Sequence, residues 1–208
     1  MGVARDERKL LSDLFVELGP DAPTLCGPWR TKDLAAHLVV RERRLDASPG
    51  IMLKPFAGHT QRVQDEYAAK PWHELVDMVR QGPPFYSPYA LGLVDELANT
   101  GEYFIHHEDV RRAQEGWQPR SPDPVRDTAL WRMLRLSAKF AYRRSPVGVV
   151  LRRPDGESVT AKSGANPVIL SGQVGELVLF ASGRSAVELE FDGDPAAVSA
   201  LKALDTGM

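Results

Sequence analysis

This sequence of 208 residues has few of the features that mark secreted, membrane-bound or nucleic-acid-binding proteins. It contains one cysteine, Cys26, so no disulfide can form within the chain. Its amino terminus is charged within the first ten residues and lacks the apolar core of a signal peptide, and its apolar runs are far shorter than a membrane span. The formal net charge is −2, which gives no overall attraction to nucleic acid or anionic membranes. We therefore expect a soluble, cytoplasmic protein that binds neither.

Apolar residues with helical spacing dominate the first 145 residues. The first helix ends at Gly19-Pro20, and Thr31 is the expected N-cap of the second, which ends at Pro49-Gly50. Pro71 interrupts the third helical stretch. The sequence therefore predicts helices over residues 5–18, 31–48, 58–81 with its break, 89–114 and 123–144.

After Pro146 the pattern changes to short strands. Residues 147–151 and 158–161 flank Asp155-Gly156, a dipeptide that favours a hairpin turn. Val168 and Leu170 indicate a third strand, followed by a short helix at 174–181, an alternating strand at 186–191 and a last helix at 195–204. We therefore expect a mainly α protein, with a helical domain at 1–145 and a small α+β domain at 146–208.

Two of the predicted helices carry residues that suit a metal ion. Glu102 and His106 are four residues apart and so lie on one helix face, where both can reach one cation. His37 would come from a neighbouring helix. Two imidazoles and one carboxylate leave a coordination position open, whereas a closed structural zinc site normally uses four protein ligands. The sequence predicts a divalent metal site with zinc as the expected ion, although nickel, iron or manganese suit the same donors.

A buried hydrogen-bond network without metal is the other interpretation of these residues. Burying an unpaired charge or imidazole costs several kcal/mol, so partners are required in either case. Asp109, one turn after His106, is the expected carboxylate that accepts the second ring N–H of that histidine. Arg41, one turn after His37, is expected to meet a substrate anion or to pair with Glu102 or Asp109.

Other residues with metal-binding groups receive lesser roles. Cys26 lies in a Cys-Gly-Pro-Trp turn, where we expect a small buried hydrophobic side chain rather than a nucleophile. His59 and His73 are expected at the surface or at helix caps, but either would supply a further imidazole if it approached the metal. His107 points about 100° away from His106 on an ideal helix, so it is not an expected ligand.

The segment from Trp29 to Leu38, WRTKDLAAHL, resembles the Trp-x-x-x-Asp-Leu-x-x-His-Leu signature of DinB-like helical bundles, in the mycothiol-dependent maleylpyruvate isomerase branch. Residues 102–109 resemble the second motif of that family, in which Asp follows a Glu-x-x-x-His pair. The run HHEDVRR at 106–112 is most similar to uncharacterised metal-binding members. Residues 170–194 resemble a half sterol-carrier-like domain. The resemblance implies a DinB-like four-helix bundle at 1–145 and a small α+β sterol-carrier-like half domain at 146–208.

The resemblance also implies a chemistry. In the isomerase branch a metal works with an external low-molecular-weight thiol, and an arginine of the carboxy-terminal domain helps to bind an acidic substrate. Motif position makes Arg184 the candidate for that arginine, and a solvated arginine at a helix end is the other interpretation of it. Residues 52–89 show no pattern that can be tied to maleylpyruvate, so the substrate is not implied.

Two classes of function fit these observations. The first is a metal-dependent enzyme that uses mycothiol or a similar thiol for transfer or isomerisation on a small anionic electrophile, with Arg184 and Arg41 as catalytic candidates. The second is a non-catalytic, metal-dependent protein that binds a small apolar or acidic ligand. Both predict a small-molecule partner.

Overall fold

Helices form most of the computed structural model, which describes residues 2–204. The chain divides into two compact units, one that ends at Trp117 and one that begins at Gln118. The first unit holds the helices α1 (Val3–Leu18), α2 (Thr31–Arg43), α3 (Ala57–Ala68), α4 (Trp72–Gln81) and α5 (Gly92–Arg111), with short 3-10 turns η1 (Ser48–Ile51), η2 (Lys54–Phe56) and η3 (Pro88–Ala90). Within residues 2–204, no helix combines the length and apolar character needed to cross a membrane.

The fully buried core of the first unit is formed by residues of α1, α2, α4 and α5. Helix α1 packs against α4 and α5, and α2 packs against α3 and α4. Phe15 of α1, Leu38 of α2, Leu75 of α4 and Tyr103 of α5 are at most 1% exposed. Since burial of a large apolar side chain contributes roughly 1.5–3 kcal/mol, this shared core fixes α2 beside α5 with their polar residues at defined positions.

The start of α2 differs from the predicted cap. Thr31 is the first residue of the helix, and its hydroxyl donates to the carbonyl of Gly19. Arg30 occupies the N-cap position, and its backbone N–H donates to the Asp33 carboxylate over 2.8 Å. The helix ends at Arg43, earlier than expected, since Arg44 at the C-cap has a φ of −118° and a ψ of 79° and so leaves the helical conformation. The cap therefore comes from the third helical residue rather than from the threonine.

The second unit contains α6 (Pro124–Ala141), β1 (Val149–Arg152), β2 (Ser158–Lys162), β3 (Val168–Ser171), α7 (Val174–Ala181), β4 (Glu190–Asp192) and α8 (Pro195–Lys202). The strands of its sheet lie in the order β2-β1-β3-β4. Strands β1 and β2 form the expected antiparallel hairpin, and Gly156 in its turn has a φ of 91°. Strand β3 is parallel to β1 and antiparallel to β4. The chain is thus mainly helical with a small mixed sheet.

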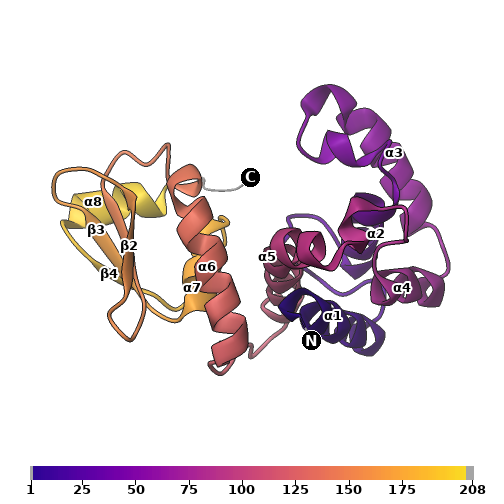
Figure 1. Cartoon of the computed structure of the whole chain (residues 1–208), viewed down its shortest axis with the longest axis horizontal. Coiled ribbons are helices and arrows are strands. Elements are labelled where there is room, and N and C mark those ends of the chain that lie inside the picture. Colours follow the sequence, from indigo (N-terminus) through magenta and orange to yellow (C-terminus); the bar gives the residue numbers. More distant parts are fainter. Residues whose placement is uncertain (1, 205–208) are drawn as a thin grey trace. The chain divides into compact units, whose positions relative to one another are not determined.

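Two expectations differ from this second unit. The strand predicted at 186–191 is limited to β4, because the backbone N–H of Glu188 donates to the Glu176 carboxylate instead of to a neighbouring strand. The predicted helix over 123–144 is α6, and it lies beside α7 in the second unit rather than in the helical domain (Figure 1). Its buried residues, among them Trp131 and Leu134, face α7 and β2. The two compact units of the structure meet at 117/118, before α6, whereas the sequence predicts a domain boundary at 145/146.

Candidate metal centre

Helices α2 and α5 bring the three predicted ligands together. His37 lies on α2, and Glu102 and His106 lie one turn apart on α5. The Glu102 Oε1 atom is 3.3 Å from His37 Nε2 and 3.4 Å from His106 Nε2. The two imidazole rings meet edge to face, with their centroids 5.5 Å apart. One donor atom of each residue therefore points toward a shared position between the helices.

These separations fit a bound ion. A tetrahedral zinc ion with bonds of about 2.0–2.1 Å to nitrogen and oxygen holds neighbouring ligand atoms about 3.4 Å apart. The separations of Glu102 Oε1 from the two Nε2 atoms, 3.3 and 3.4 Å, are close to that spacing. The Glu102 side chain is 24% exposed, against 9% for His37 and 12% for His106, so the group is most open to solvent at the carboxylate. The donor set and these two separations therefore suit a divalent cation.

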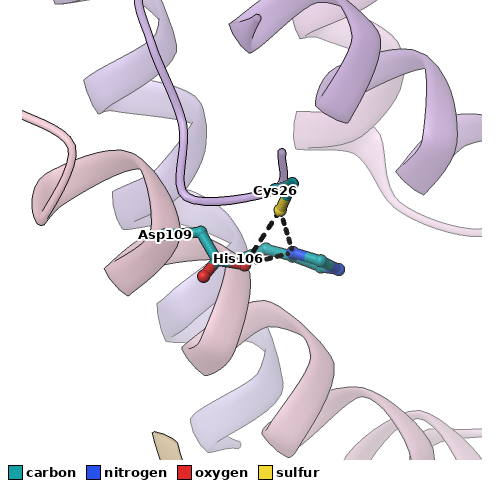
Figure 2. A group of neighbouring side chains, drawn as sticks. All are labelled: Cys26, His106 and Asp109. Atoms are coloured by element: carbon teal, nitrogen blue, oxygen red, sulfur yellow. Dashed lines mark hydrogen bonds and ion pairs between the residues drawn. The ribbon is translucent and has the colours of Figure 1, made fainter. Parts of the chain in front are cut away.

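Asp109 and Cys26 contact the opposite edge of the His106 ring (Figure 2). The fully buried Asp109 carboxylate lies 2.9 Å from His106 Nδ1, as its position one turn later predicted. Cys26 Sγ lies 3.1 Å from the same carboxylate oxygen and 3.7 Å from Nδ1. We expected Cys26 to be a buried hydrophobic side chain, but it is half-buried and makes a polar contact. Cys26 lies in the turn before α2, and no sequence pattern indicates that it would contact Asp109 of α5.

Cys26, His106 and Asp109 also have donor atoms suited to a metal, but their geometry indicates hydrogen bonding. The 2.9 Å from Nδ1 to the carboxylate is a hydrogen-bond length and is shorter than the spacing that a tetrahedral ion imposes. The three residues do not form a catalytic triad either. In a triad, the nucleophile contacts one ring nitrogen of the histidine and the carboxylate contacts the other. Here the sulfur and the carboxylate both lie at Nδ1. Nε2 of His106 is left to face Glu102.

The protonation of the metal-free cluster follows from burial and these contacts. Burial alone would lower the pKa of His106, but the hydrogen bond to Asp109, the Cys26 contact and Glu102 raise it well above its ordinary value. Burial would raise the pKa of Glu102, yet hydrogen bonds from both histidines hold that pKa well below its ordinary value. Burial lowers the pKa of His37 in spite of its hydrogen bond to Glu102. Without metal, the cluster therefore combines a protonated His106, an ionised Glu102 and a neutral His37.

Arg41 pairs with the carboxylate of the cluster. Its Nε lies 3.4 Å from Glu102 Oε1, the pairing that the sequence suggested as one of its options. Its other nitrogens donate to the side-chain oxygen of Asn99 and to the carbonyl of Ala98, and its guanidinium group lies over the ring of Tyr89 at 4.7 Å. These contacts hold Arg41 against Glu102.

Asn99 connects Arg41 to a second buried polar cluster, which the sequence analysis did not identify. The Asn99 amide donates to Glu42 Oε1 over 2.9 Å and to Asp95 Oδ1 over 2.7 Å. Arg8 Nη2 approaches the same two oxygens, at 3.1 and 2.6 Å. The amide group of Asn99 is therefore oriented by two carboxylates, so its oxygen faces Arg41. We call Arg8, Glu42, Asp95 and Asn99 the Arg8 cluster.

The remaining histidines lie away from the candidate ligands. His73 is exposed and His59 is half-buried, and His59 Nε2 lies 3.2 Å from Asp46. Among the described residues, neither belongs to a group with metal-binding geometry. His107 faces α1, where its Nδ1 lies 2.9 Å from the buried Glu7 carboxylate. In the structure, none of these three histidines belongs to the group formed by His37, Glu102 and His106.

Arg184 follows α7 in the second unit. Its Nη1 donates to the carbonyl of Ser182 over 2.6 Å, and its backbone N–H donates to the carbonyl of Leu179 over 3.0 Å. The preceding Gly183 has a φ of 84°, which turns the chain at the end of the helix. The arginine is half-buried and held locally at the C-terminal end of α7.

No protein-family model matches the sequence, and no curated protein matches it. Among solved structures, the chain is similar to a crystal structure of a mycothiol-dependent maleylpyruvate isomerase. The TM-score is 0.61 and the identity 17%, over 91% of this chain and 90% of the other. A histidine-to-alanine mutant of such an isomerase gives a TM-score of 0.63 and 16% identity over the same shares. The chain shares the fold of these isomerases. That shared fold extends over nearly the whole of both chains.

Proposed function

We propose that this protein is a divalent-metal-dependent enzyme that uses an external low-molecular-weight thiol, similar to mycothiol, for transfer or isomerisation on a small anionic electrophile. The observation that carries the proposal is the convergence of His37, Glu102 and His106 with separations that suit zinc. The fold shared with proteins described as mycothiol-dependent isomerases supports the thiol requirement.

Each residue of the cluster has a distinct role in this proposal. His37, Glu102 and His106 would hold the ion, and Asp109 keeps the Nδ1 proton on His106 so that Nε2 is the ligand atom. Arg41 holds the Glu102 carboxylate in place. When bound, a divalent ion with an open position lowers the pKa of a thiol or water and polarises a substrate oxygen.

The thiol in this proposal comes from outside the protein. Cys26 is the one thiol of the chain, and its S–H donates to Asp109 on the Nδ1 side of the His106 ring. The candidate ligand atom of that ring is Nε2, on the opposite side. A diffusible thiol is therefore the reactant that the centre requires.

Thiol-dependent turnover tests the proposal. Metal-loaded protein is assayed against a panel of small anionic electrophiles, with and without mycothiol or glutathione. We expect conversion that requires both the metal and the thiol and that is lost in His37→Ala. His73→Ala is the matched control, because it removes an exposed histidine away from the cluster. Ligand binding without turnover, on the same panel, would favour the non-catalytic binding protein instead.

A further inference from the structure

The turn between α1 and α2 contacts both imidazoles of the candidate metal centre. The ring of Trp29 lies against that of His37, with centroids 5.2 Å apart. Cys26, three residues earlier, contacts Asp109 and His106 (Figure 2). This turn supplies none of the three candidate ligands. It nevertheless contacts His37 and His106, and also Asp109, the hydrogen-bond partner of His106.

Hydrogen bonds hold the turn in one conformation. The Thr24 hydroxyl donates to the Trp29 carbonyl over 2.8 Å and accepts the backbone N–H of Cys26 over 3.1 Å. The backbone N–H of Leu25 donates to the carbonyl of Asp109 over 3.0 Å, which ties the turn to α5. The position of the Cys26 sulfur beside the Asp109 side chain is therefore fixed from both ends.

The Asp109 carboxylate transmits this contact to the ligand histidine. Its Oδ2 accepts from His106 Nδ1 over 2.9 Å and from the Cys26 thiol over 3.1 Å. Two donors on one oxygen restrict rotation of the carboxylate, and the carboxylate in turn restricts the imidazole ring. With Nδ1 held by the carboxylate, Nε2 is the ring nitrogen that faces Glu102 and that a metal ion can bind once its proton is lost.

We propose that Cys26 is a positioning residue of the metal centre, which acts through Asp109 to fix the orientation of the His106 ring, and that it is neither a metal ligand nor a nucleophile. This inference rests on the metal centre of the proposed function. It gives the single thiol of the chain a role that a serine hydroxyl can replace in part and an alanine methyl group cannot.

Chelator competition with zinc on the full chain tests this role in the parent protein, Cys26→Ser and Cys26→Ala. Loss of the hydrogen-bond partner of a ligand histidine typically weakens metal binding about 10- to 100-fold. Cys26 is a weak donor that contacts this partner, Asp109, so its loss should weaken metal binding less. We expect Cys26→Ala to bind zinc about three- to tenfold more weakly than the parent. Cys26→Ser should regain most of that loss. Both variants lack the sulfur atom, but only Cys26→Ser keeps a hydrogen-bond donor for Asp109. The difference in zinc affinity between the two variants therefore reports the donor, even if both substitutions change the packing of the turn.

Cobalt spectra separate positioning from ligation. Without added thiol, the cobalt-loaded parent should show no thiolate-to-cobalt charge-transfer band, and Cys26→Ala should shift the ligand-field bands. A charge-transfer band that disappears in Cys26→Ala would make Cys26 a ligand and overturn the inference. Equal zinc affinity in the parent and Cys26→Ala, or equally weak binding in both variants, would also overturn it. A parent that binds no metal would instead refute the proposed function, and this inference with it.

Discussion

Two neighbouring polar clusters connect α2 with α5, and the Arg8 cluster also includes Arg8 of α1; the chemical composition of the two clusters differs. In the Arg8 cluster, a guanidinium and an amide donate to the carboxylates of Glu42 and Asp95, so protein donors satisfy the acceptors. In the candidate metal centre, the Nε2 atoms of His37 and His106 converge on the Glu102 carboxylate, and Arg41 also pairs with that carboxylate. Once its proton is lost, each imidazole nitrogen can bind a metal ion, whereas the guanidinium and amide of the Arg8 cluster can only donate to carboxylates. The predictions below separate the two clusters.

The largest effect is expected when a ligand of the metal centre is removed. Protein purified without chelator should contain one divalent ion per chain, and His106→Ala should contain almost none. The reason is that one imidazole and one carboxylate hold a divalent ion poorly without the third ligand. Elemental analysis measures the content. Equal metal in His106→Ala, the parent and the exposed-site control His73→Ala would contradict the assignment.

The opposite behaviour is expected for the Arg8 cluster. Arg8→Ala leaves the buried Glu42 carboxylate and the half-buried Asp95 carboxylate without their cation, and breaking a buried ion pair in this way costs about 3–5 kcal/mol. Urea unfolding of the metal-free variant should show that loss of stability. At temperatures where the variant remains folded, it should still bind one ion. If Arg8→Ala lost the metal but kept its stability, the division into a structural and a metal-binding cluster would be wrong.

Asp109→Asn should have an intermediate effect. The amide keeps the size of the side chain but no longer offers a carboxylate to His106 Nδ1, so the ring orientation and the basicity of Nε2 change. Loss of such a partner typically weakens metal binding about 10- to 100-fold. Chelator competition measures the affinity. Affinity equal to that of the parent would show that the carboxylate does not support the ligand.

The smallest effect concerns pH. Proton and metal compete for Nε2 of His106, whose pKa in the metal-free protein lies well above its ordinary value. At neutral pH the metal must displace this proton, so zinc affinity should rise as the pH increases through neutrality, with release of a proton. Calorimetry in buffers of different ionisation enthalpy counts the protons. Affinity that is constant between pH 6 and pH 8 would exclude a protonated His106.

Spacing along helices was sufficient to predict which side chains of the candidate metal centre lie close together. The i,i+4 relation placed Glu102 beside His106, and polar residues within apolar helix faces pointed to His37 as their partner. The pattern could not predict Cys26, because its contact with Asp109 depends on how the turn before α2 folds back onto α5.

The Arg8 cluster and the position of α6 were not predictable for a related reason. Charged residues such as Glu42 and Asp95 are usually solvated, and the sequence does not show that Arg8 meets them in the core. The apolar stripe of α6 showed which face is buried, but not that its partners are α7 and β2. Helical periodicity determines faces, whereas tertiary packing determines partners.

Thiol titration of the cobalt-loaded protein tests the central claim most directly, namely that three protein ligands leave a position where an external thiol binds. We expect a thiolate-to-cobalt charge-transfer band that grows to saturation with mycothiol or a small thiol analogue and is absent in His37→Ala. A visible spectrum that does not change across a saturating titration, or one that already indicates four protein ligands before thiol is added, would contradict the open metal centre.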